Sequence, residues 1–144
     1  MRAALAGIGL KDAHATQLLE GAVEVDFLEV HAENLMVAGG PRLRRLERLR
    51  ERLPLSIHGV GLSIGGQGPL NPAHLDEVAA LLARFEPRWV SEHLAWSSHG
   101  GVWLNDLLPV PYDRPTLDRV CEHIDQVQAR MGLRILLENP STYL

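Results

Sequence analysis

Cysteine and long apolar runs are nearly absent from this sequence. Cys121 is the only cysteine, so no disulfide bond can form within the chain. No apolar run approaches the ~18 residues of a membrane-spanning helix. The opening MRAALAGIGL, with one basic residue and a short apolar run, predicts a strand rather than a signal peptide. These absences predict a soluble, cytoplasmic protein, and the place of Cys121 among apolar positions of an expected helix predicts a buried thiol.

Positive charge is also scarce. Lysine and arginine number 14 against 18 aspartates and glutamates, for a net charge of −4, and aromatic residues make up only 5%. No cluster interleaves basic with aromatic side chains, and the arginine-rich run 42–52 is typical of the solvated face of a helix. The composition therefore predicts neither nucleic acid nor an anionic membrane as a partner.

What the chain does contain is a repeated unit of apolar run, turn and amphipathic helix. Its 144 residues, 46% hydrophobic and 22% charged, suit one globular domain, since single domains typically span ~100–200 residues. The runs at 3–9, 25–30, 55–58, 89–94 and 134–139 predict strands. Residues 11–20, 41–53, 71–85 and 116–132 predict helices.

This alternation predicts an α/β fold with a parallel sheet covered by helices, either doubly wound or a (β/α)8 TIM barrel. The motif Gly7-Ile8-Gly9 lacks the third glycine of a dinucleotide fingerprint, which weakens the doubly wound alternative. Polar residues at successive strand ends favour the barrel, because barrel active sites are assembled there. A complete barrel has eight strands in typically ~250 residues, and this sequence supplies five strands.

Three of the polar residues at strand ends have the chemistry of metal ligands. His58, His93 and Glu138 close the third, fourth and fifth expected strands, and each separation is about one strand–helix unit. In a parallel barrel such positions converge, and imidazole with carboxylate suits a divalent transition metal such as Fe, Mn or Zn. The alternative is three unrelated, hydrogen-bonded polar residues. The shared register favours the metal site.

Other polar residues have two interpretations each. Glu29, His31, Glu33 and Asn34 crowd the end of the second strand, where they either cap a turn or support the ligands, and Asn139 beside Glu138 is similarly ambiguous. His99 and Asp106 lie in the long connection 95–115, predicted to be a binding loop with a short hairpin arm at 102–104. They either face substrate or are solvated. Glu92 is expected on the opposite side of its strand, in structural pairing, and His14, His74 and His123 on helix surfaces.

The glycine-rich loop 59–68 also has two readings. Its backbone amides suit a phosphate, but tight packing in a barrel also uses glycine.

Five motifs, in order, closely resemble one family. They are EVHAEN (29–34), SIHGVGLSIG (56–65), SEHLAWS (91–97), LNDLLPVPY (104–112) and LLENPSTYL (136–144). The family is that of the multinuclear non-heme iron-dependent oxidases, which include the methanobactin-biosynthesis oxidase and long carried the label of an uncharacterised conserved protein.

The resemblance implies a TIM barrel of the xylose-isomerase-like type with two or three irons at its C-terminal mouth. It implies an oxidase that uses O₂ to modify cysteines of a ribosomally made precursor peptide, aided by a small partner protein that delivers the peptide. The motif histidines correspond to His58 and His93, and the metal-bridging glutamate corresponds to Glu138.

The family's remaining ligands come from strands six to eight, which this sequence does not supply. Residues 1–144 are therefore expected to form a single domain that is the N-terminal part of a barrel, inactive alone and prone to self-association through open strand edges. Two alternatives remain. One is a divalent-metal isomerase or phosphodiesterase of the same barrel type, and the other is a non-catalytic association module or fragment.

Overall fold

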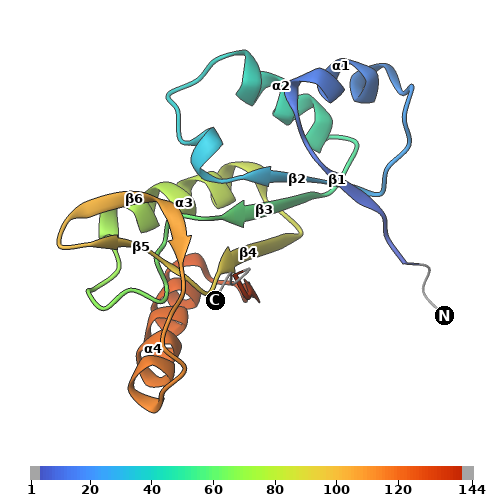
Figure 1. Ribbon diagram of the computed structural model, residues 1–144. Coiled ribbons are helices and arrows are strands. Elements are labelled where there is room, and N and C mark those ends of the chain that lie inside the picture. Colours follow the sequence, from blue (N-terminus) through green and yellow to red (C-terminus); the bar gives the residue numbers. More distant parts are fainter. Residues whose placement is uncertain (1–3, 141–144) are drawn as a thin grey trace.

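The structure is a computed structural model that describes residues 4–140. Strands and helices alternate along the chain (Figure 1). In order, the elements are β1 (Gly7–Gly9), α1 (Asp12–Glu20), β2 (Phe27–His31), the 3-10 turn η1 (Glu33–Leu35), α2 (Pro41–Arg50), β3 (Leu55–Gly59), α3 (Pro72–Phe85), β4 (Trp89–His93), β5 (Trp96–His99), β6 (Val102–Leu108), α4 (Arg114–Met131) and β7 (Leu136–Glu138). The expected strand 3–9 is shorter than predicted, and its first residue lies outside the described range, as do the last four residues of the motif 136–144.

Five strands form one parallel sheet in the order β1-β2-β3-β4-β7. Each parallel neighbour is joined by a connection that contains a helix, as parallel pairing requires. The register pairs His31 with His58, His58 with Ser91, and His93 with Glu138. Because paired residues of neighbouring strands project from the same face, these side chains share one face of the sheet.

The opposite face carries the hydrophobic core. Leu28, Val30, Leu55, Ile57 and Val90 alternate with the polar positions and are buried. Helical leucine, valine and phenylalanine side chains at 3/4 spacing cover them: Leu43, Leu46 and Leu49 from α2, Val78, Leu81, Leu82 and Phe85 from α3, and Val120 and Val127 from α4. The helices follow one another around the sheet (Figure 1). One face is therefore packed, and the other is free for polar groups.

Caps fix where the two longest helices begin. Asn71 accepts hydrogen bonds from the amides of Ala73 and His74 at the start of α3, as the Asn-Pro sequence predicts. The side chain of Asp113 accepts from the amide of Thr116, so α4 begins at Arg114, two residues before the expected start. Gly132 ends α4 with a φ of +69°, the left-handed conformation typical of a glycine C-cap.

The long connection after β4 forms a hairpin, and the expected arm extends over all of β6. Strands β5 and β6 pair antiparallel, with Gly100 and Gly101 at positive φ in the turn. The hydroxyl of Ser63 accepts hydrogen bonds from the amides of Ser97 (2.9 Å) and Ser98 (3.3 Å). The hairpin is thereby fastened to the loop that follows β3, beyond the arrowheads of β2 and β3 in Figure 1.

Two predictions for α4 are wrong. Cys121 is exposed, and His123 is buried at 5% exposure, where its ring donates through Nδ1 to the carbonyl of Ile64 (2.8 Å). Val120, His123 and Val127 share the inward side of α4, so the rotation of the helix turns Cys121 outward. Across residues 4–140, no helix is both long and apolar enough to cross a membrane.

Candidate metal centre

Three predicted ligands meet at the carboxyl ends of β3, β4 and β7. The Nε2 atoms of His58 and His93 are 2.9 Å apart, and Nε2 of His58 lies 3.6 Å from Oε2 of Glu138. One donor atom from each residue lies within 4.8 Å of both others. Ligands about 2.1 Å from a cation, at roughly a right angle, are themselves about 3 Å apart. The donor spacing therefore fits a single divalent ion.

A neighbouring serine sets the orientation of His58. Its Nδ1 atom lies 2.7 Å from the hydroxyl of Ser91, which faces it across the register of β3 and β4. In the tautomer that carries its proton on Nδ1, His58 donates to Ser91 and the lone pair of Nε2 faces His93 and Glu138. Support of this kind fixes the tautomer of metal-binding histidines.

Burial keeps His58 in its ligating form. Its side chain is 8% exposed. Burial and then the adjacent His93 lower the pKa of His58, outweighing the carboxylates of Glu138 and Glu29. A neutral imidazole is the form that binds a metal. The buried Nδ1 of His93 has no hydrogen-bond partner within residues 4–140. The facing Nε2 atoms of His58 and His93 are within hydrogen-bond distance, so they share one proton that a metal bound by both nitrogens would displace.

Glu138 approaches from a different environment. Its side chain is 58% exposed, and β7 is held to β4 by backbone bonds that include the amide of Leu94 donating to the carbonyl of Glu138 at 2.7 Å. Two imidazoles and a carboxylate form a donor set that suits Fe, Mn or Zn. The residues present therefore fit a transition metal, and the donor set leaves its identity open.

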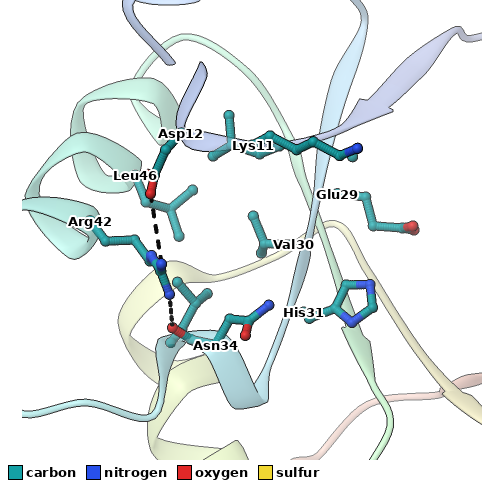
Figure 2. Close-up of a pocket in the computed structure, with 11 residues that line it drawn as sticks. Lys11, Asp12, Glu29, Val30, His31, Asn34, Arg42 and Leu46 are labelled. Carbon is teal, nitrogen blue, oxygen red and sulfur yellow. Dashed lines mark hydrogen bonds and ion pairs between the residues drawn. The ribbon is translucent and has the colours of Figure 1, made fainter. Parts of the chain in front are cut away.

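Glu29 and His31 lie beside this centre. The hydroxyl of Ser56 donates to Glu29 at 3.1 Å, and the His31 ring packs edge-on against His58 with centroids 5.3 Å apart. Asn34 lies further out, and its backbone carbonyl accepts a hydrogen bond from the guanidinium group of Arg42 at 3.1 Å. The three residues line a cavity of about 340 Å³, in which Arg42 extends between Asp12 and Asn34 (Figure 2).

The other proposed substrate-facing residues are not part of the donor group. His99 packs edge-on against Trp96 in the hairpin, and Asn139 is exposed just past β7. Asp106 lies on β6, in a second cavity that His31 also lines. Only Asp106 thus adjoins the surroundings of the centre.

The sequence pattern did not predict the role of two residues near the ligands, Ser91 and Glu92. Ser91 could have been found, since it lies two positions before His93 and therefore on the same face of the strand. Glu92 projects to the opposite face, as predicted, but it is 2% exposed and accepts bonds from the amides of His93 (3.0 Å) and Leu62 (3.4 Å) rather than pairing with a cation. Burial raises the pKa of Glu92 to about 8.

The glycine-rich loop is a packing element. Its amides have protein partners: Val60 donates to Glu33, Leu62 to Glu92, Gly65 to the carbonyl of Ala95, and Gly66 to the carbonyl of Ser63. A Cβ atom at Gly59 would clash with Glu92, and one at Gly65 would clash with Val110. None of these four backbone amides is therefore free to bind a phosphate group.

Another surface prediction also fails. His74 has a side chain that is only 14% exposed, and its Nε2 lies 3.5 Å from Oε1 of Glu33. This contact joins the start of α3 to the end of β2, a long-range pairing that helix periodicity does not reveal.

Fold and site together define an α/β protein of the barrel type with a two-histidine, one-glutamate metal group at its strand ends. Residues 5–144 match the family model described as "RiPP precursor modification enzyme MbnB/TglH/ChrH". The chain belongs to this family, which confirms the resemblance carried by the five motifs. At family level the match supports an enzyme that modifies a ribosomally made precursor peptide.

Similar proteins agree on the family and the fold. A UPF0276 protein of Paraburkholderia phytofirmans is 54% identical over 138 residues, covering 96% of this chain and 45% of that protein. One from Bordetella pertussis is 52% identical over 141 residues, covering 98% and 49%. A crystal structure of D-psicose 3-epimerase in the presence of D-fructose superposes with a TM-score of 0.59 at 13% identity, over 93% of this chain and 51% of that one. This likeness confirms the xylose-isomerase-like TIM-barrel fold, and the chain spans about half the length of these proteins.

Proposed function

We propose that this chain supplies the His58, His93 and Glu138 part of an iron site in an oxidase that modifies cysteine residues of a ribosomally synthesised precursor peptide with O₂. The observation that carries the proposal is the convergence of the three donor atoms within 4.8 Å. Family membership supports the peptide substrate. Iron bound there would supply one-electron and O₂ chemistry, which amino-acid side chains lack.

The chain's own residues have separate roles in this proposal. Ser91 holds the proton at Nδ1 of His58, so that Nε2 is free to bind. Burial of β3 excludes water from the inner side of the site, whereas the exposed Glu138 leaves its outer side open to a peptide. We propose that the family's two- or three-iron cluster is completed by residues outside 1–144, with Glu138 as a bridging ligand. Mn or Zn would fit the same donors.

Two partners belong to the proposal. One is a small protein that delivers the precursor peptide. The other is a further polypeptide segment or second copy on the β7 edge, supported by Leu136 at 58% and Leu137 at 39% exposure. Light scattering is expected to show a dimer or larger species, and a stable monomer would contradict self-association.

The test uses the chain loaded with Fe(II) without oxygen, alone and with the rest of a barrel from a relative supplied in trans. On exposure to O₂, the assembled barrel is expected to change the mass of a cysteine-containing precursor peptide in step with oxygen uptake. The chain alone is expected to leave the peptide unchanged. Both signals should vanish in the double variant His58→Ala, Glu138→Ala. Undiminished iron content in that variant would refute the site.

The alternative is a divalent-metal isomerase of the same barrel type, favoured by the fold likeness to the epimerase structure. In it the metal acts as a Lewis acid and no O₂ is consumed. Turnover of a sugar with Mg or Zn in anaerobic buffer would support this alternative over the oxidase.

A further inference from the structure

A second cavity, of about 610 Å³, lies under the β5–β6 hairpin and is not used by the metal centre. Its walls come from β6, the loop after β3, the start of α3 and the end of β2. Val60, Trp103, Leu104 and Leu107 make it largely apolar. Among the described residues, only His58, His93 and Glu138 form a donor group close enough to share a metal ion, so this cavity calls for a different kind of ligand.

The fixed charge in this cavity is negative. Glu33 and Asp106 line it, and no lysine or arginine does. Burial alone would raise the pKa of Glu33, but His74 and the amide of Val60 outweigh it and hold that pKa below its ordinary value. Glu33 is therefore ionised at neutral pH. A cationic group entering the cavity would meet two carboxylates and no lysine or arginine, with His74 already paired to Glu33.

Two polar atoms at the cavity lack hydrogen-bond partners among the described residues. Ser97 is 5% exposed, lines the cavity, and its hydroxyl has no hydrogen-bond partner within residues 4–140. The buried Oε2 of Glu33 is also without one. Leaving a buried hydroxyl and a buried carboxylate oxygen unsatisfied costs stability.

The aromatic wall suits a long side chain with a charged end. The indole of Trp103 lies 5.6 Å from the His74 ring and is 47% exposed, so one part of it is fixed and another is available. Aliphatic stems pack on such apolar walls, and ammonium or guanidinium groups are attracted to indole faces.

Close packing against Gly61 fixes the positions of the Glu33 and His74 side chains in this cavity. A Cβ atom at Gly61 would lie 2.9 Å from both Oε1 of Glu33 and Nε2 of His74. Only glycine at this position lets the loop pass over the pair in its present place. The carboxylate is thus positioned by long-range packing.

We propose that this cavity binds a lysine or arginine side chain of the substrate peptide, next to the residue presented to the metal. The peptide nature of the ligand rests on the proposed function, whereas the preference for a basic side chain rests on the cavity. His31 lines the cavity, and its ring packs against His58 at 5.3 Å. The cavity therefore adjoins the metal centre, and the basic residue is expected close to the reacting one in the peptide sequence.

The test measures binding without metal. The probes are glycyl-lysyl-glycine, blocked at both ends, and the same peptide with norleucine, which keeps the stem and lacks the ammonium group. They are titrated into the chelator-treated chain while the indole N–H signal of Trp103 is followed by NMR. We expect the lysine peptide to bind at about 1 mM and the norleucine peptide at least about fivefold more weakly.

Variants then assign the preference to the cavity. Asp106→Asn replaces an exposed residue and should reduce it, as should Glu33→Gln, whose oxygen still accepts from Val60. Glu122→Gln, an exposed acid on α4, is the matched control and should leave it unchanged. Equal binding of both peptides, no binding of either, or a lysine preference that survives these cavity variants would overturn the inference.

A last variant separates this inference from the metal site. The double variant His58→Ala, Glu138→Ala should still prefer lysine, because neither residue lines the cavity. Lysine binding without iron-dependent oxidation would refute the proposed function alone. Oxidation without a lysine preference would refute the cavity inference alone.

Discussion

Strand β3, which carries His58, is buried at all five residues, whereas all three residues of β7, which carries Glu138, are exposed. Both strands deliver a ligand to the same point. His58 is held by Ser91 in a packed interior, while Glu138 is placed by the backbone pairing of β7 with β4 and its exposed side chain contacts His58. The inner half of the site is therefore preorganised, and the outer half is adjustable. Such a division suits a centre whose open side receives both further ligands and a substrate.

The largest effect expected from breaking this arrangement is on metal affinity. His58→Ala removes a preorganised donor and should weaken Fe(II) or Co(II) binding by more than about 100-fold, because losing supporting groups alone costs 10–100-fold. Calorimetry under anaerobic conditions measures it. His99→Ala is the matched control, an exposed histidine in the hairpin that packs against Trp96. Unchanged affinity in His58→Ala would show that His58 is not a ligand.

The next effect is on stability and compares the same two strands. Ile57→Ala on β3 removes a side chain with 0% exposure and should cost about 2–5 kcal/mol in the free energy of unfolding. Leu136→Ala on β7 removes one with 58% exposure and should cost less than about 1 kcal/mol. Urea unfolding measures both. A large loss from Leu136→Ala would mean that β7 is covered in solution.

Glu92 makes the buried side sensitive to pH. Its pKa is raised by burial, from 4.5 to about 8. Between these two pH values the folded state keeps the proton on Glu92, whereas the unfolded state has released it. The contribution of Glu92 protonation to the free energy of unfolding is therefore complete below about pH 4.5 and is lost as the pH rises through 8. Glu92→Gln keeps a neutral group in place and should lose this dependence.

The measurement is urea unfolding at several pH values between 5 and 9. The variant should gain on the wild type by on the order of 2 kcal/mol across that range. Glu122→Gln is the exposed control. Parallel pH profiles for wild type and Glu92→Gln would contradict a neutral, buried Glu92.

The sequence was sufficient for the parallel sheet and for the convergence of the three candidate ligands because both follow from local pattern. Apolar runs followed by breakers mark strand ends, and parallel strand ends converge. What it could not supply depends on contacts between distant segments. Ser91 meets His58 only through the register of β3 with β4, and His74 and His123 are buried by a neighbouring turn and loop. Cys121 faces outward because α4 packs through Val120, His123 and Val127.

The smallest expected effect tests the support on the inner side. Ser91→Ala leaves His58 in place but removes the acceptor at 2.7 Å from its Nδ1. Metal affinity should fall about tenfold, the lower end for supporting groups, and nitrogen NMR should show the His58 proton redistributed between Nδ1 and Nε2. Ser91→Thr keeps the hydroxyl on a strand and should restore both. Ser56→Ala, which removes a hydroxyl that serves Glu29 instead, is the control. An unchanged tautomer in Ser91→Ala would mean that packing of β3 alone orients the ring, and the preorganisation would then belong to the sheet and not to the serine.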